Sequence, residues 1–298
     1  MFKNFSEVEK HLITNDIKKH IVLCGSHDSI GLHAVVRAKR KGFVKATLIG
    51  DEEKTLAILN EMNEPVEDYE IIHETRELKA CRMGVKMVTE GEADIPMKGL
   101  VQSAPYIMCI QNPMGGLMEE GNMLNEATAF YYPDQDRILF VGDCAVNIFP
   151  ALGEKRKIIN NIVKLAGYFG YEEVRVAAVS VIEKPDPTIP SSIEADELSK
   201  MEWPENMIVE GPFGLDNALD PEAARHKGID SRVAGKADVL LMPDIHAGNI
   251  IHKSIRFFGH YEFASVLCGT KSPVIMTSRT ADEDSKYNSI MASILQSL

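Results

Sequence analysis

The chain alternates short apolar runs, most of which end in Gly, Pro or Asp, with longer stretches of helical periodicity. This alternation predicts βαβ units, in which helices cover the faces of a mostly parallel sheet. There are more of these short runs than one small sheet has strands. A chain of 298 residues is also long enough to form two hydrophobic cores. The expected strands are residues 21–26, 45–50, 70–74, 93–97, 127–132, 137–142, 174–182, 207–211, 237–243, 263–269 and 272–278.

One stretch has the pattern of a hairpin, AFYYPDQDRILFV at residues 129–141, in which Pro-Asp-Gln-Asp forms the turn between two strands. We interpret it as the place where the chain passes from one sheet to the next. The sequence therefore predicts an α/β fold of two αβα lobes with mostly parallel sheets. The first lobe is expected to comprise residues 1–126 plus 269–298, and the second residues 127–268.

The composition excludes several classes of protein. A net charge of -12 argues against nucleic-acid binding, which depends on clustered Lys and Arg, although local cations can still hold a small anion. Five scattered cysteines without a Cys-x-x-Cys pair are typical of reduced thiols in the cytoplasm. The polar N-terminus lacks the core of a signal peptide, and no run approaches the roughly 20 apolar residues of a membrane span. We therefore expect a cytoplasmic protein with neither nucleic-acid nor membrane partners.

Candidate site residues follow the predicted strands, because ligands of open α/β sheets bind beyond the carboxyl ends of strands. The first such corner is ADIPMKGLVQS at residues 93–103. Lys98 offers a point charge to a phosphate and Gly99 lets the backbone approach it, while Gln102 and Ser103 enter the next helix. The alternative interpretation of Lys98 is a solvated loop lysine.

The second corner is FVGDCAVN at residues 140–147, where Asp143, Cys144 and Asn147 follow a strongly apolar strand. Cys144 could accept an acyl group as a nucleophile, but no neighbouring His or Lys is visible that would generate a thiolate. A packed and unreactive cysteine is the favoured interpretation, in keeping with the burial typical of free Cys.

The third corner, in residues 239–254, ends a strand with Asp244 and opens a helix at Gly248 and Asn249. Free amide groups at such a helix start, together with the helix dipole, favour an anion. His246 and His252 next to Asp244 leave a metal site as an alternative. Their spacing matches no strong ligand motif, so we expect no metal.

The fourth corner is the end of the last predicted strand, where Ser278 and Arg279 precede an acidic stretch and the final helix. Serine supplies a hydrogen-bond donor, and the guanidinium is a permanently charged fork that matches two phosphate oxygens. An exposed arginine at an ordinary strand end is the alternative.

Taken together, these corners resemble the phosphate acetyltransferase and phosphate butyryltransferase family over nearly the whole chain. The matching stretches are ADIPMKGLVQS, RILFVGDCAVN, the long and highly specific run of residues 209–254, and PVIMTSR. MKGLVQS and PDIHAGNIIHKS are more similar to the butyryl branch than to the acetyl branch. The long run adds Asp216 and Lys253 to the candidate substrate contacts.

The resemblance implies a two-lobed fold like that of isocitrate dehydrogenase, a homodimer or higher homo-oligomer, and a coenzyme A cleft between lobes. It implies reversible transfer of a short acyl group, butyryl or branched C4–C5, between coenzyme A and inorganic phosphate, with no metal or redox cofactor. Arg279 would bind phosphate, and Ser278 would hydrogen-bond the developing oxyanion or the thiol sulfur.

The sequence departs from the family pattern at two places. The acetyl branch carries an aspartate in the last helix where this chain has Ser285, and Asp284, one residue earlier, is the candidate base. Relatives carry an arginine and often a Ser-His pair where this chain has Met118, Leu124 and Asn125. Two alternative functions therefore remain. One is a non-catalytic paralogue that senses an acyl-CoA or acyl phosphate, and the other is a metal- and nucleotide-dependent decarboxylating dehydrogenase.

Overall fold

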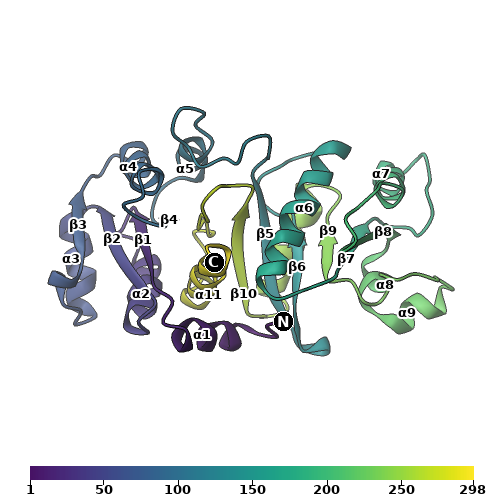
Figure 1. The fold of residues 1–298 in the computed structure, drawn as a ribbon, viewed down its shortest axis with the longest axis horizontal. Helices are drawn as coiled ribbons and strands as arrows, with labels where there is room; N and C mark the ends of the chain where they lie inside the picture. The colour runs from purple at the N-terminus through teal and green to yellow at the C-terminus, as the bar shows by residue number, and fades with distance from the viewer. The chain divides into compact units, whose positions relative to one another are not determined.

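Two separate groups of strands form in the structure, a computed structural model that describes residues 1–298 (Figure 1). We call residues 5–124 and 262–298 the terminal unit, and residues 1–4 and 125–261 the central unit. The α/β class with mostly parallel sheets is therefore confirmed. The chain leaves the terminal unit after residue 124 and returns at residue 262, whereas we predicted the return near residue 268.

The terminal unit contains a parallel sheet in the order β3-β2-β1-β4. Its central strand, β1, buries all four residues of Ile21–Cys24, as a strand covered on both faces requires. The strands are β1 (Lys19–Cys24), β2 (Val44–Gly50), β3 (Glu70–His73) and β4 (Ile95–Lys98). The helices of this unit are α1 (Phe5–Thr14), α2 (Ser29–Arg40), α3 (Glu52–Glu61), α4 (Glu77–Thr89), α5 (Ser103–Ile110) and α11 (Glu283–Gln296).

Strand β10 (Phe263–Cys268) belongs to the terminal unit because it packs on α11. The Ser289 hydroxyl, inside α11, accepts a hydrogen bond of 2.9 Å from the backbone N–H of Ser265. This buried polar contact links β10 to α11. The strand predicted at 272–278 is reduced to isolated bridges at Val274 and Ile275, because Pro273 has no N–H to extend the ladder.

The central unit pairs β5 (Asn125–Tyr132) with β6 (Arg137–Gly142) as the predicted antiparallel hairpin and continues in the order β6-β9-β7-β8 with parallel pairing. Asp136 closes the hairpin turn in the left-handed conformation, at φ 46°. The remaining strands are β7 (Val174–Val179), β8 (Met207–Phe213) and β9 (Val239–Leu241), and the helices are α6 (Leu152–Tyr168), α7 (Pro190–Ser199), α8 (Leu215–Leu219), α9 (Pro221–His226) and α10 (Ile245–Phe257).

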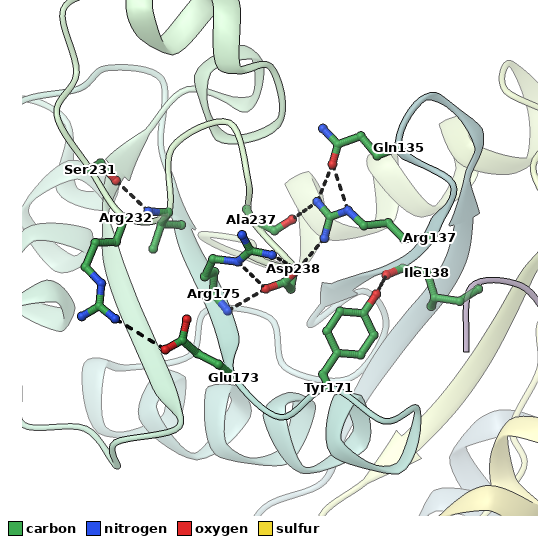
Figure 2. A network of polar contacts seen from close by, with 11 residues as sticks. Gln135, Arg137, Ile138, Tyr171, Glu173, Arg175, Ser231, Arg232, Ala237 and Asp238 are labelled. Carbon is green, nitrogen blue, oxygen red and sulfur yellow. Dashed lines mark hydrogen bonds and ion pairs between the residues drawn. The ribbon is translucent and has the colours of Figure 1, made fainter. Parts of the chain in front are cut away.

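A charged network closes the amino edge of this second sheet, where β6, β7 and β9 begin (Figure 2). The fully buried carboxylate of Asp238 accepts hydrogen bonds from Arg137 at 2.5 Å and from the Arg175 side chain at 2.9 and 3.0 Å. Its second oxygen also accepts from the Arg175 backbone N–H. The network joins three strands, and its polar groups hydrogen-bond one another. We therefore assign it a structural role.

Candidate active site

The carboxyl ends of β1 and β4 lie side by side in the terminal unit, where Cys24 pairs with Lys98 in the parallel register. The chain turns away from both strands at glycines. A side chain at Gly99 would place its Cβ only 2.4 Å from the carbonyl oxygen of Gly25, so both positions must stay without side chains. This close approach fixes the backbone that carries Lys98.

Lys98 ends β4 with its side chain inside the protein, at 1% exposure. Its ammonium group has one hydrogen bond, a long contact of 3.4 Å to the carbonyl of Gly99, and no carboxylate within ion-pair distance. Burial, together with the positive charges of Lys286 and Arg279, lowers the pKa of Lys98 to about 8, against the opposing effect of Asp28. A buried amine of this kind is not the solvated loop lysine of the alternative interpretation.

A second buried lysine lies in the same corner. Lys286, from α11, donates a hydrogen bond of 2.9 Å to Asp28, which lies in the loop between β1 and α2. Asp28 occupies the N-cap position of α2, but its side chain makes no cap hydrogen bond and is directed to Lys286 instead. Three cations, Lys98, Lys286 and Arg279, thus influence one region that contains a single carboxylate. This excess of positive charge favours an anionic ligand.

Ser278 and Arg279 reach this corner because Ile275, three residues before Ser278, bridges to Met97 of β4. The backbone N–H of Lys98 donates to Ile275 at 2.9 Å, which places the following residues beyond the end of β4. Ser278 is half-buried and its hydroxyl lies 3.1 Å from that of Thr280. Arg279 is exposed and its guanidinium makes no ion pair, while the buried hydroxyl of Thr277 has no hydrogen-bond partner. The Thr277 hydroxyl and the Arg279 guanidinium remain available to a ligand.

Asp284 lies apart from the buried lysines, on the outer side of the first turn of α11. Its side chain is 78% exposed and pairs with Arg37 at 2.6 Å. Glu283 approaches the same Arg37 at 3.9 Å, and Asp282 caps the helix by accepting from the N–H of Ser285 at 2.9 Å. The structure therefore does not bring Asp284 together with Lys98, because the helix start directs it toward α2.

Gln102 and Ser103 lie at the start of α5, as predicted. Gln102 holds the N-cap position with an exposed side chain, and its backbone N–H donates to Glu77 at 2.9 Å. Ser103, the first residue of the helix, is also exposed. Both side chains are accessible but are not part of the buried cationic corner.

In the central unit, Asp143 organises the loop after β6. Its carboxylate accepts hydrogen bonds from the backbone N–H groups of residues 126, 145, 146 and 147, and from the Asn147 side chain at 2.5 Å. Burial raises the pKa of Asp143, although these hydrogen bonds oppose the shift. Asp143 and Asn147, two predicted site residues, therefore shape this loop, and Asp143 also joins it to β5.

The first turn of α10 packs directly on this loop. Asp244 caps the helix by accepting from the N–H groups of His246 at 2.8 Å and of residue 247 at 3.0 Å. Any side chain at Gly248 would clash with the Asp143 carbonyl, at 2.1 Å from the Cβ position. Asn249 donates to the Cys144 carbonyl at 3.1 Å. The predicted residues of the second and third corners thus come together at one edge of the sheet.

A buried polar group lies behind this corner, on β5 and α10. The Thr128 hydroxyl bonds to Glu126 at 3.1 Å and to a ring nitrogen of His252 at 2.8 Å. Burial, with the charges of Lys253 and Arg256, lowers the pKa of His252 to about 4, so the ring is neutral near pH 7. Burial also lowers the pKa of Lys253, whereas Glu126 raises it.

Cys144 is completely enclosed beside this group, and its thiol contacts the carbonyl of Val141 at 3.7 Å. Burial raises the pKa of Cys144 well above its usual value. A buried thiol with a raised pKa is a poor nucleophile. No cluster of His, Cys, Asp and Glu side chains suited to a metal ion occurs.

Asp216 lies elsewhere in the central unit. It belongs to α8, which follows β8, and β7 separates that strand from β9. Its carboxylate pairs with Lys227 at 2.8 Å, and this contact lowers the pKa of Asp216. The structure does not bring Asp216 together with Asp143 and Asp244.

Sequence reasoning missed Asp28, Lys286, Thr277 and Glu126. Asp28 lies two residues after a predicted strand, so the rule that located the other corners could have found it. Glu126 and Lys286 carried a weaker signal, Glu126 as the one charge of a buried strand and Lys286 as the one basic residue of its helix. Thr277 became notable only when the structure left its buried hydroxyl without a partner.

Comparison with known proteins identifies the family. The model of the family described as phosphate acetyl/butaryl transferase matches residues 57–294. A phosphate butyryltransferase of Clostridium acetobutylicum is 37% identical over 99% of this chain and 98% of its own length. A phosphate acetyltransferase of Thermotoga maritima is 36% identical over 92% of this chain and 94% of its own.

A solved structure, that of a branched-chain phosphotransacylase from Enterococcus faecalis, superposes with a TM-score of 0.83 at 26% identity. The superposition covers 94% of this chain and 99% of that one. No helix of the chain is long and apolar enough to cross a membrane.

Proposed function

The chain belongs to the phosphate acetyl/butaryl transferase family, and we propose that it catalyses reversible transfer of a short acyl group between coenzyme A and inorganic phosphate. Its relatives are named for butyryl and acetyl transfer, and the neighbouring solved structure for branched-chain acyl transfer. For this chain we propose butyryl or branched C4–C5 groups, on the butyryl-like stretches MKGLVQS and PDIHAGNIIHKS.

The single observation that carries this function is the cationic corner of the terminal unit. Lys98 and Lys286 are buried and Arg279 is exposed and unpaired, with only Asp28 to balance them. Phosphate and acyl phosphate are the anions of the reaction, and both present oxygens that match a guanidinium fork. We infer that the phosphate group binds between Arg279 and the end of β4.

Acyl transfer needs a phosphate oxygen, or the thiol sulfur in the reverse direction, held against the acyl carbon. The tetrahedral intermediate places negative charge on the former carbonyl oxygen, which a nearby donor must stabilise. We assign this donor role to the half-buried Ser278, with the unpartnered Thr277 hydroxyl beside it. A ternary complex fits these groups, since Cys144 is unsuited to carry the acyl group.

For coenzyme A, we propose contacts in the central unit with Asn249 and Lys253 of α10. The first amides of this helix already donate to Asp244 and to Ile148, so the positive charge of Lys253 is the group suited to a phosphate of the nucleotide. In the terminal unit, Gln102 and Ser103 at the start of α5 are accessible polar groups, and we propose them as substrate contacts of that unit. We further propose a cytoplasmic enzyme that forms a homodimer or higher homo-oligomer and needs neither metal nor redox cofactor.

A turnover assay with butyryl phosphate and coenzyme A tests the function directly, by following thioester formation. Butyryl-CoA should appear in stoichiometric amounts with phosphate. Binding of both substrates without turnover would instead support the non-catalytic paralogue. Loss of turnover on addition of a chelator would favour the metal-dependent dehydrogenase class over the one proposed.

A further inference from the structure

We propose that Lys98 accepts the thiol proton of coenzyme A during acyl-CoA synthesis and returns it to the departing phosphate. This role rests on the proposed phosphate acyltransferase function and adds a catalytic residue to it. Lys98 ends β4 beside Ile275, to whose carbonyl its backbone N–H donates, so residues 276–279 continue from this end of the strand. The charge of Arg279 acts on the Lys98 amine.

The reaction requires such a group because a neutral thiol is a weak nucleophile. The sulfur–hydrogen bond breaks as its proton passes to the Lys98 amine, and the electron pair stays on sulfur. The thiolate forms a bond to the acyl carbon, and the bond from that carbon to the phosphate oxygen then breaks with its electron pair on oxygen. The proton held by Lys98 passes to this oxygen, so acyl phosphate and thiol become thioester and hydrogen phosphate with no further reactant.

The carboxylates of this part of the terminal unit are engaged elsewhere. Asp28 is paired with the buried Lys286 at 2.9 Å, and Asp284 is paired with Arg37 on the outer side of α11. Asp282 caps that helix through the N–H of Ser285. Ser285 itself is buried and donates its hydroxyl proton to the carbonyl of Asp282 at 3.1 Å. A base for the thiol must therefore come from another kind of side chain.

Lys98 has the surroundings that a neutral amine needs. Lys286 of α11 and Arg279 after the final bridge face it with positive charge, Asp28 of the β1–α2 loop opposes them, and Cys81 of α4 is an un-ionised thiol. Burial is the largest influence, and together these groups lower the pKa of Lys98 to about 8. An amine with a pKa near the working pH is effective both as acceptor and as donor of a proton.

Lys98→Arg separates this role from simple attraction of phosphate. Arginine keeps the positive charge but cannot lose its proton in this pH range. Wild-type kcat for thioester formation should fall about tenfold per pH unit below about 8, because the amine becomes protonated. In Lys98→Arg we expect kcat at pH 8 to fall by about 10²–10⁴-fold. The decrease of kcat toward low pH, the acidic limb of the pH profile, should be absent, and the affinity for phosphate should be largely kept.

Lys98→Ala provides the second measurement, because small primary amines added to the solution should restore part of its rate in proportion to their basicity. The matched control is Lys271→Arg, an exposed lysine of the same unit, which should behave like the wild type. Circular dichroism verifies that each variant is folded.

The outcomes distinguish the two levels of the proposal. If the wild type makes no butyryl-CoA from butyryl phosphate, the proposed function itself fails. If the wild type turns over and folded Lys98→Arg keeps both its rate and its pH limb, Lys98 is only a phosphate-binding cation and the inference is overturned. Failure of amines to rescue folded Lys98→Ala would also count against proton transfer.

Discussion

The charge state and orientation of single side chains separate binding groups from structural ones at this site. Arg279 is exposed, unpaired and permanently charged, whereas Asp143 and Asn147 satisfy one another within a loop. Lys98 differs from both, since burial makes its protonation variable near neutral pH. The residues that follow the strands are therefore not equivalent, although the same rule selected them.

Arg279→Ala should weaken phosphate recognition more than any other single change at the terminal-unit corner. A lost charge-assisted contact costs about 1.5–3 kcal/mol, which corresponds to roughly ten- to over a hundred-fold in kcat/KM. Arg279→Lys should also be a poor replacement, because an ammonium lacks the planar fork. Steady-state kinetics with varied phosphate measures both variants, and near wild-type constants in each would remove Arg279 from the site.

Asp284→Asn should change turnover by less than about twofold, because Asp284 is exposed on Arg37 and exposed pairs contribute about 0–1 kcal/mol. The sequence alone made Asp284 the candidate base, so this variant compares that assignment directly with Lys98. A loss of about a hundredfold or more in kcat, with the fold intact, would restore Asp284 to the catalytic set.

Cys144→Ser should retain substantial turnover, since the thiol is enclosed and its pKa is raised. The substitution keeps the volume of the side chain and leaves a hydroxyl near the carbonyl of Val141. Rapid-quench analysis of the wild type should reveal no acyl-enzyme. A trapped acyl-thioester at Cys144, or a collapsed rate in a folded variant, would contradict a ternary-complex mechanism.

At the scale of elements, the apolar runs located the strands because parallel strands are buried on both faces and carry a strong signal. The last run, residues 272–278, formed only bridges, because Pro273 interrupts the ladder. The pairing of Asp28 with Lys286 could not be predicted, since it joins residues from opposite ends of the chain. Periodicity shows which face of an element is buried but not which distant charge meets it.

The same limitation applies to Asp238, whose two arginine partners on β6 and β7 were not anticipated (Figure 2). Asp238→Ala should lower the free energy of unfolding by about 3–5 kcal/mol, because it removes the buried carboxylate that compensates the positive charge of the two arginines. Denaturant unfolding measures this change. Glu173→Gln, which alters only the exposed 3.5 Å pair with Arg232, is the control and should change stability by less than about 1 kcal/mol. Equal effects of the two substitutions would show that the network does not stabilise the unit.

At the scale of the whole molecule, the similarity to relatives leaves the acyl group open, because identities of 37% to a butyryltransferase and 36% to an acetyltransferase do not discriminate. The butyryl-like stretches carry the prediction that longer chains are preferred. Each methylene buried in an apolar pocket contributes up to about 0.8 kcal/mol, so two methylenes allow at most about a fifteenfold preference. Neighbouring chain lengths should then differ by only a few-fold.

The measurement is kcat/KM for a series from acetyl to pentanoyl phosphate, with the branched C4 and C5 compounds included, at saturating coenzyme A. We expect the constants to rise from acetyl to butyryl and to change little or fall beyond C5, where the pocket is filled. Because the reacting carbonyl and phosphate are the same throughout the series, Arg279→Ala should lower every member by a similar factor. An acetyl constant equal to or above that of butyryl would contradict the preference while leaving the transferase chemistry intact, since the pocket and the phosphate site contribute separately to the transition state.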